Sequence, residues 1–427
     1  MLRLSKYFSS VKLDDDLYAI FNRLYFKILY VREFELKKIL NYDIDMEILS
    51  LMIDYYIYSS EEMDNYIYEE IIKSFTEDSS IRTIYIIPSE FCNMNCKYCF
   101  IYNNSNNKIK TIMDINIAEK IIYKISKYMR YINNDKIMIQ FYGGEPTLNW
   151  NIIEYIVNNL KNYNIDWSII TNGTNFNNKM IDYIKRNNIS VGLSLDGPNF
   201  INDIDRIYTQ KSINFSKIVE NLDRLLCKNI NLSISLTLTM NVINNKEKVL
   251  NWIKTLGVKG VNYNLLHFRN VETDFLKKYY SDSTNFIIDS YNTIGDKIYE
   301  DRINRKILSF NNRIFKYSDC SAGAGKQITI NSSGDIVYCN CDFLNKNKII
   351  ANIKDVNIEE ITTFNSIKDE WINKLPIYNK KCIDCDSIFI CGGGCISHHN
   401  NFGIDEGFCI HTQKMLYWLL KETYKKI

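Results

Sequence analysis

The sequence predicts an α/β fold built on a partial (β/α)6 barrel of the TIM type, with a small α+β unit before it and a cysteine-rich region after it. Three observations support this. Six short apolar runs between Arg82 and Leu266 alternate with segments of helical periodicity, which is typical of parallel βαβ units. A loop with three cysteines follows the first run. A second group of cysteines lies in the last third of the chain.

The composition predicts a cytoplasmic globular protein of more than one domain. The chain has 427 residues, is 46% hydrophobic and carries a formal charge of +2, so it has ample core and little electrostatic basis for capturing nucleic acid. A membrane partner is not expected either. No run of ~20 apolar residues occurs, and three aspartates, Asp14 to Asp16, interrupt the region where a signal peptide would be apolar.

Twelve cysteines in a reducing compartment favour metal binding over disulfides. Eleven of them fall into patterned groups. The remaining one, Cys227, lies on a helical pattern and is expected in the core.

Residues 1–78 are predicted to form a separate unit. Aromatic and β-branched runs at Leu17–Ile20 and Leu24–Val31 predict a hairpin. Helical spacing follows at Glu33–Asn41, Asp45–Tyr58 and Ser60–Phe75, with Asp45 and Ser60 as N-caps. Such a unit resembles the winged-helix precursor-recognition domain of peptide-modifying enzymes, in which an extended leader peptide adds a strand to the sheet edge. The alternative is a lid or packing extension without a ligand.

Residues 79–268 are predicted to form the barrel. The expected strands are Arg82–Pro88, Ile137–Phe141, Trp167–Thr171, Ile189–Leu195, Asn231–Thr239 and Val261–Leu266, with helices such as Ile115–Tyr131 and Asn214–Lys228 between them. Functional residues of such barrels gather at the C-terminal ends of the strands. Residues 269–317 carry helical spacing and are expected to bridge to the cysteine-rich domain, 318–427.

The loop after the first strand carries Cys92, Cys96 and Cys99 at a Cx3Cx2C spacing. Three thiolates can hold three corners of a cubane iron–sulfur cluster, and S-adenosylmethionine can chelate the fourth iron. A zinc site lacking a ligand, or plain buried thiols, are the alternatives. The loop, with Tyr98 and Phe100 flanking the third cysteine, resembles that of the radical S-adenosylmethionine (SAM) superfamily. The resemblance implies a 5′-deoxyadenosyl radical.

Motifs after the next strands resemble the cofactor-binding positions of that superfamily. Gly143-Gly144-Glu145-Pro146 resembles its GGEP motif, which implies that backbone and acid hold the methionyl amino group. Arg206 is the expected partner of the methionyl carboxylate, since a guanidinium matches a carboxylate bidentately; an ordinary surface arginine is the alternative. The resemblance assigns cofactor binding to Tyr98, Gly143, Gly144, Glu145, Thr171, Asn172, Ser194, Asp196 and Arg206.

The C-terminal cysteines resemble the seven-cysteine pattern of the SPASM domain, which binds two auxiliary four-iron clusters. The matching residues are Cys320, Cys339, Cys382, Cys385, Cys391, Cys395 and Cys409. The resemblance assigns Cys382, Cys385, Cys391 and Cys409 to an outer cluster and Cys320, Cys339 and Cys395 to an inner one. A zinc ribbon would leave three of the seven unexplained.

The chain departs from the SPASM pattern at Cys339-Asn340-Cys341, where two thiols stand in place of one. Family members with a fully ligated inner cluster have an extra cysteine shortly before the first, and this chain has none between Cys227 and Cys320. The resemblance therefore implies an open iron in the inner cluster, unless Cys341 completes it. Related thioether-forming maturases are thought to hold a substrate thiolate at such an iron. The nearby His398, His399 and His411 are expected to be structural or to tune the clusters through hydrogen bonds.

The resemblance implies an enzyme with three [4Fe-4S] clusters and S-adenosylmethionine that modifies a ribosomally made peptide, by thioether formation first and carbon–carbon crosslinking second. Its partners would be a precursor peptide with a leader segment and a reducing donor, flavodoxin or ferredoxin.

Two other functions remain open. Sulfatase maturation, the oxidation of a Cys or Ser to formylglycine, is favoured by Cys341-Asp342-Phe343, in which Asp342 would be a general base. A precursor-binding or electron-transfer module without turnover is the third possibility. It predicts clusters but no cleavage of S-adenosylmethionine.

Overall fold

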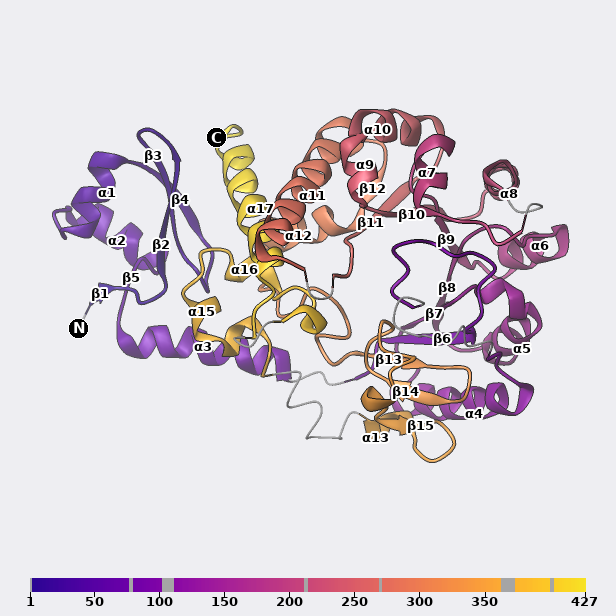
Figure 1. Ribbon diagram of the computed structural model, residues 1–427. Helices are drawn as coiled ribbons and strands as arrows, with labels where there is room; N and C mark the ends of the chain where they lie inside the picture. Colours follow the sequence, from indigo (N-terminus) through magenta and orange to yellow (C-terminus); the bar gives the residue numbers. More distant parts are fainter. Residues whose placement is uncertain are drawn as a thin grey trace.

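The computed structural model describes residues 2–76, 80–101, 111–210, 214–268, 271–361, 373–399 and 403–427 (Figure 1). The expected domain boundaries at 78/79 and 268/269 involve residues 77–79 and 269–270, which lie outside the described residues. We therefore describe the elements on either side of them.

Six parallel strands form the centre of the molecule and confirm the partial barrel. They are β6 (Thr83–Ser89), β7 (Ile137–Gly143), β8 (Ile165–Thr171), β9 (Ser190–Ser194), β10 (Leu232–Thr237) and β11 (Gly260–Asn264). Each pairs with its neighbour in chain order. All six coincide with the predicted strands to within two residues at each end, because a strand buried on both faces gives an unbroken β-branched run.

Helices connect these strands. They are α4 (Ile115–Tyr131), α5 (Trp150–Leu160) after a 3-10 turn η1 (Pro146–Asn149), α6 (Asn178–Arg186), α7 (Asn199–Asp205), α8 (Phe215–Cys227), α9 (Met240–Asn244) and α10 (Lys246–Thr255). The predicted helices 115–131 and 214–228 are confirmed. Asn214 caps α8 by accepting from the Lys217 amide at 3.0 Å. The expectation for Cys227 was wrong: it is exposed, because the buried face of α8 is formed by Ile218, Leu222 and Leu225.

The sheet continues beyond the six strands at both edges. On one side β12 (Tyr299–Glu300) pairs with β11 in parallel, and on the other β13 (Gln327–Ile330) pairs with β6 in parallel. Then β14 (Asp335–Val337) and β15 (Ala351–Asn352) follow in antiparallel order. The strand order is thus linear. The predicted bridge is helical, with α11 (Thr273–Ile294) and α12 (Asp301–Asn312) on either side of β12.

The C-terminal cysteine region is mostly irregular and is closed by one long helix. Its short elements are η2 (Lys346–Lys348), α13 (Ile358–Ile361), η3 (Pro376–Tyr378), α15 (Lys380–Ile383), α16 (Ile388–Cys391) and η4 (Ile396–His398). The long helix is α17 (Glu406–Tyr424), which packs along α11 between the barrel and the N-terminal unit (Figure 1).

The N-terminal unit is an antiparallel meander followed by three helices. Its strands are β2 (Phe8–Asp14), β3 (Leu17–Asn22) and β4 (Ile28–Arg32), with a small ladder of β1 (Arg3–Leu4) and β5 (Tyr58–Ser59); its helices are α1 (Glu33–Leu40), α2 (Met46–Asp54) and α3 (Glu61–Thr76). The predicted hairpin corresponds to β3 and β4, although its connection is longer. The predicted caps are present: Asp45 accepts from Ile48 at 2.8 Å and Ser60 from Met63 at 3.2 Å.

The two ends of the chain share one hydrophobic cluster. Phe26 of the N-terminal unit stacks on Phe389 of α16 with ring centroids 4.5 Å apart. The Tyr30 hydroxyl donates to the Leu420 carbonyl of α17 at 2.9 Å. The N-terminal unit is therefore packed against the cysteine region. Among the described helices, no segment combines the length and apolar character that crossing a bilayer requires.

Candidate active site

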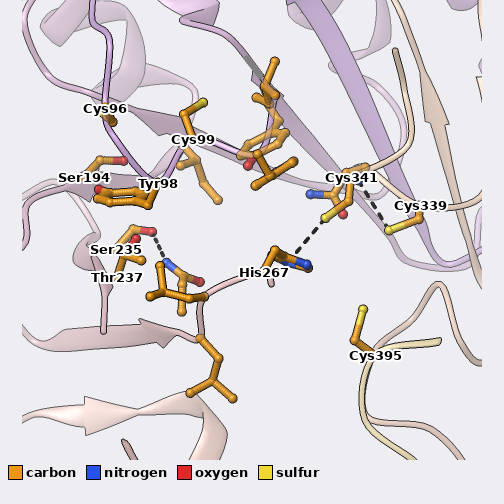
Figure 2. Close-up of a pocket in the computed structure, with 18 of the residues that line it drawn as sticks. Cys96, Tyr98, Cys99, Ser194, Ser235, Thr237, His267, Cys339, Cys341 and Cys395 are labelled. Carbon is orange, nitrogen blue, oxygen red and sulfur yellow. Dashed lines mark hydrogen bonds between the residues drawn. The ribbon is translucent and has the colours of Figure 1, made fainter. Parts of the chain in front are cut away.

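A cavity of about 480 Å³ opens at the C-terminal ends of the barrel strands. Two groups of cysteines face it from opposite sides, the first from the loop after β6 and the second from the C-terminal region (Figure 2). Of the predicted site residues, its lining contains Cys92, Cys96, Tyr98, Cys99, Gly143, Gly144, Thr171, Asn172, Ser194, Arg206, Cys320, Cys339, Cys341 and Cys395.

Backbone hydrogen bonds hold the Cys92–Cys99 loop over the strand ends. The amides of Asn95 and Lys97 donate to the carbonyls of Ile207 and Asp205 at 2.7 and 2.8 Å, so the loop pairs with the end of α7. Within the loop, the Met94 amide points at Cys92 Sγ over 3.4 Å. The Asn172 side-chain amide, at the end of β8, approaches the same sulfur at 3.7 Å. Cys92, Cys96 and Cys99 all line the cavity, so the loop presents its three cysteines to one space.

Burial disfavours the free thiolate form of these cysteines. It raises the pKa of the Cys96 thiol to about 11, although the Arg206 guanidinium opposes the shift, and it raises the pKa of Cys92 further. Buried thiols remain protonated unless a cation compensates the thiolate charge, which is what a bound metal does. The chemistry of this donor set thus fits a metal cluster.

Gly143 and Gly144, at the end of β7, allow close backbone packing. A Cβ on Gly144 would lie 2.4 Å from the Phe91 carbonyl oxygen, and one on Gly143, whose φ is +126°, would lie 2.6 Å from that of Ser89. The Gly144 and Glu145 amides donate to these two carbonyls, Ser89 and Phe91, at 3.0 and 2.9 Å. The glycines therefore position the cysteine loop in addition to lining the cavity.

Glu145 is fully buried and is not among the described residues that line the cavity. Its carboxylate accepts four hydrogen bonds: from the amide and hydroxyl of Thr147 at 3.0 and 2.6 Å, the hydroxyl of Thr171 at 2.7 Å and the amide of Asn172 at 2.7 Å. Burial raises the pKa of Glu145 while these hydrogen bonds oppose the shift. The structure thus places Glu145 as a brace between the ends of β7 and β8, behind the wall formed by Thr171 and Asn172.

Asp196 organises the opposite wall. Its Oδ2 accepts from Arg206 Nε at 2.9 Å and from the Tyr98 hydroxyl at 2.5 Å, and its Oδ1 accepts from the Thr237 amide at 2.8 Å. Arg206 is buried, faces the cavity and places Nη1 4.0 Å from Cys96 Sγ. The neighbouring Asp196 carboxylate keeps the pKa of Arg206 above its usual value, against the effect of burial. A fixed cation therefore stands beside the cysteine loop, and Ser194 lines the same cavity.

Ser235, Thr237 and Asn264 also line the cavity, at the ends of β10 and β11, and sequence reasoning missed them. Asn264 Nδ2 donates to the Ser235 hydroxyl at 2.9 Å. The sequence did contain an indication of them, because each is a polar residue at the C-terminal end of a predicted barrel strand, where functional residues gather.

The inner C-terminal cysteines gather on the far side of the cavity. Cys320, Cys339, Cys341 and Cys395 all line it. The Cys341 amide lies 3.4 Å from Cys339 Sγ. The side-chain hydrogen bond from Cys341 lowers the pKa of Cys339, and the same contact raises the pKa of Cys341. The structure places both thiols of the Cys339-Asn340-Cys341 pair at this site.

The outer four cysteines form a second group, on α15, α16, α17 and the turn after α15. Burial raises the pKa of Cys382 to about 12, with further contributions from Cys391 and Cys385; Cys409 is affected by the same three thiols. The Cys385 amide donates to the Cys382 carbonyl at 3.0 Å, and α16, which ends at Cys391, packs against α17, which carries Cys409. Cys391 Sγ also accepts from the Gly393 amide at 3.3 Å. The group fits a four-thiolate site apart from the cavity.

Asp342 directly follows Cys341, but it is buried and is not among the described cavity-lining residues. Of the histidines named from sequence, His411 is buried and hydrogen-bonded to the Thr284 hydroxyl, and His399 Nε2 lies 3.0 Å from the Gly393 carbonyl. His398 lines the cavity together with His267, which sequence reasoning missed. A single histidine after a strand gives no pattern in one sequence.

Comparison with known proteins identifies the chain. Residues 86–256 match the model of the radical SAM superfamily. An uncharacterised protein of Methanocaldococcus jannaschii is 33% identical over 62% of this chain and 86% of its own length. The chain belongs to the radical SAM superfamily. It is therefore an enzyme of the class that uses a [4Fe-4S] cluster and S-adenosylmethionine.

Two named relatives extend the similarity. The chain is 28% identical to the radical SAM cyclopropyl synthase TigE of Paramaledivibacter caminithermalis over 100% of its length and 97% of that protein. It is 27% identical to a cysteine-type anaerobic sulfatase-maturating enzyme of Clostridium novyi over 72% of its length and 85% of that protein.

Solved structures confirm the radical SAM fold. Native anSMEcpe with bound AdoMet covers 80% of this chain and matches over 97% of its own, at a TM-score of 0.68 and 20% identity. Streptococcus suis SuiB bound to precursor peptide SuiA covers 96% of this chain and matches over its entire length, at a TM-score of 0.58 and 14% identity. The second match thus covers a larger share of this chain than the first.

Proposed function

We propose that this protein is a radical SAM enzyme that modifies a ribosomally synthesised peptide by closing a carbon–carbon bond, with the N-terminal unit holding the leader segment of the peptide. The observation that carries this proposal is the share of the chain that each relative matches. The cyclopropyl synthase matches 100% of the chain, whereas the sulfatase-maturating enzyme of Clostridium novyi matches 72%. Thioether formation is the second possibility for the bond.

The cavity supports a division of roles among its residues. We assign Cys92, Cys96 and Cys99 to the cluster that binds S-adenosylmethionine, because their sulfurs face one buried space. When bound there, the cluster and S-adenosylmethionine would supply a 5′-deoxyadenosyl radical able to remove a hydrogen atom from the substrate.

Arg206 is proposed to bind the methionyl carboxylate, since it is a fixed cation on the wall beside Cys96. Tyr98 and Asp196 hold the guanidinium in place. Asn172 and Ser194, with the backbone of Gly143 and Gly144, form the polar wall along which the nucleoside is proposed to lie. Thr171 lines the cavity and Glu145 lies behind it, and the two are proposed to act as a brace that orients Asn172.

The C-terminal cysteines are proposed to hold two auxiliary [4Fe-4S] clusters. The outer set is Cys382, Cys385, Cys391 and Cys409, and the inner set contains Cys320, Cys339 and Cys395, with Cys341 beside them. The inner set shares the cavity with the first cysteine loop (Figure 2), so a peptide side chain between them would face both. Closing a ring within one side chain would remove two hydrogen atoms, one as the atom retained in 5′-deoxyadenosine and the other as a proton and an electron, and the inner cluster would accept that electron.

The substrate is proposed to enter as an extended segment. The three-stranded sheet of the N-terminal unit has β2 and β4 as its edge strands, and an extended leader could add to one of them. That sheet is packed on the cysteine region through Phe26 and Phe389, which would hold the leader at a fixed place relative to the cavity. An external low-potential donor, flavodoxin or ferredoxin, is proposed to supply the electron.

The experiment is anaerobic incubation of the reduced enzyme with a candidate precursor peptide encoded beside its gene, followed by mass spectrometry. The proposal predicts a product lighter by two hydrogen atoms whose cysteine thiols, if it has any, remain open to alkylation. A product with blocked thiols would favour the thioether. A protein without the Cys92 loop sulfurs is the control.

Sulfatase maturation remains the alternative, because this chain is similar to sulfatase-maturating enzymes and contains the sequence Cys341-Asp342-Phe343. In the same assay a sulfatase-derived peptide containing the target Cys would give an aldehyde that reacts with a hydrazine probe. An aldehyde from this peptide, with no change in the neighbouring precursor, would contradict the crosslinking proposal. The buried position of Asp342 is against its acting as a base at the cavity surface.

A further inference from the structure

A histidine from the barrel lies among the inner C-terminal cysteines. The ligand atoms of His267, Cys395 and His398 all lie within 4.8 Å of one another, and His267 Nε2 is 3.6 Å from Cys341 Sγ. Imidazole nitrogen and thiolate sulfur are both good ligands for iron. In Figure 2, His267 lies between the cysteine loop of the barrel and the group formed by Cys339, Cys341 and Cys395.

The second ring nitrogen of His267, Nδ1, contacts another side chain of the protein. This nitrogen lies 2.9 Å from Nε2 of His398, and Nδ1 of His398 lies 3.7 Å from the buried carboxylate of Asp405. If Nδ1 of His267 carries the hydrogen and donates it to His398, the lone pair of Nε2 faces Cys341. Metal-binding histidines are commonly fixed in this way, with one nitrogen engaged by the protein and the other left for the metal.

The position of His267 in the fold is also fixed. It follows β11 by three residues, and its ring centroid lies 5.2 Å from that of Phe100, the residue after Cys99. The side chain therefore reaches from the barrel towards the C-terminal cysteines across the shared cavity.

We propose that Nε2 of His267 is a ligand of the inner auxiliary iron–sulfur cluster, at the iron left by the thiolates of Cys320, Cys339 and Cys395. This proposal rests on the auxiliary clusters of the proposed function and is independent of the peptide substrate. Cys341 is the competing ligand for the same iron. A neutral imidazole in place of a thiolate makes a cluster less negative and raises its reduction potential. The inner cluster would then be a better electron acceptor than the all-cysteine outer cluster.

The test uses the full chain with Cys92, Cys96 and Cys99 changed to Ala, so that only auxiliary iron remains. This protein is prepared with ¹⁴N- or ¹⁵N-labelled histidine, reconstituted with iron and sulfide, reduced, and examined by pulsed electron paramagnetic resonance. We expect a nitrogen coupling of the size typical of a directly bound imidazole, which changes with the isotope. It should disappear in His267→Gln and persist in His399→Gln, because His399 bonds to the Gly393 carbonyl instead.

A second measurement protects the test against misfolding. His267→Cys supplies a thiolate at the same place, and we expect it to retain the auxiliary iron of the parent protein, to lack the nitrogen coupling and to shift the reduction potential of the inner cluster downwards.

If the parent binds auxiliary iron without a histidine coupling, or if the coupling survives His267→Gln, the assignment of His267 is wrong while the auxiliary clusters stand. A spectrum altered by Cys341→Ser and unaffected by His267→Gln would assign the iron to Cys341 and also overturn the proposal. If the parent binds no auxiliary iron, the clusters themselves are refuted, and the His267 proposal with them.

Discussion

Arg206 and Asp196 form a buried ion pair with Nε and Oδ2 2.9 Å apart. The same carboxylate accepts from Tyr98 in the cysteine loop and from the Thr237 amide at the end of β10. One acid thus joins the cysteine loop, the end of α7 and two strand ends around the cavity. Removing it would leave the guanidinium buried without its partner.

Asp196→Ala is expected to reduce the free energy of unfolding by ~3–5 kcal/mol, the usual cost of breaking a buried pair on one side. The matched control is Asp166→Ala. It removes the partner of Lys136 from a pair whose side chains are 62% and 61% exposed, and we expect a loss of ~1 kcal/mol or less. Denaturant unfolding of both variants measures the difference. Equal losses would show that Asp196 does not organise this wall.

Gly144→Ala is expected to displace the cysteine loop, because the added Cβ would lie 2.4 Å from the Phe91 carbonyl oxygen. Backbone must move to relieve this contact, so iron binding by the loop should fall together with thermal stability. Gly257→Ala serves as the control, since its Cβ would meet nothing within 4 Å and only its φ of +70° is strained, at a cost of ~1–2 kcal/mol. Normal iron content in the Gly144 variant would argue against the proposed packing role.

Glu300 should make stability depend on pH. Burial raises its pKa from 4.5 to about 7, although the amides of Arg302 and Ile303 donate to it. The folded state therefore holds this proton more tightly than the unfolded state. The resulting contribution is complete below the unfolded pKa of 4.5 and is lost as the pH rises through about 7.

Glu300→Gln cannot ionise, so its free energy of unfolding should lack this decrease, which is ~3 kcal/mol at most. Unfolding at about pH 5 and about pH 8 measures the effect. Glu47→Gln, at an exposed first-turn position of α2, is the control and should follow the parent protein. A Glu300→Gln curve parallel to that of the parent would contradict the assignment.

The triple change of Cys92, Cys96 and Cys99 to Ala should remove one cluster of three. Anaerobically reconstituted protein is then expected to keep about two thirds of the parent's iron, because the other thiols lie on separate elements. Iron and sulfide analysis checks this. If all iron is lost, the division of the cysteines into independent sites is wrong.

The barrel could be predicted well because its strands carry local signals. The run around Ile84 to Ile87 is buried on both faces, and such runs are continuous in sequence. In contrast, β2 was missed because Ser9, Ser10 and Lys12 interrupt its apolar pattern. The pairing of β13 with β6 was also missed, since a four-residue strand gives no indication of a partner more than two hundred residues away.

The sequence predicted many of the residues that line the cavity, but not the contacts that their side chains make. The resemblance assigned Glu145 and Asp196 to cofactor binding, but the sequence could not show that both carboxylates accept hydrogen bonds from within the protein. His267 carries no motif, and its place beside Cys341 depends on a contact between residues 74 positions apart. Long-range contacts of this kind are set by packing of whole elements, which no local pattern records.

The central claim is that the Cys92 loop and the Arg206 wall form a working site for S-adenosylmethionine, and one measurement tests it most directly. Anaerobically reconstituted protein is mixed with S-adenosylmethionine and dithionite, and 5′-deoxyadenosine is quantified by chromatography with mass detection. We predict formation of 5′-deoxyadenosine and methionine by the parent protein, and none by the variant lacking Cys92, Cys96 and Cys99. A parent protein that carries its full iron content and still leaves S-adenosylmethionine intact would contradict the account.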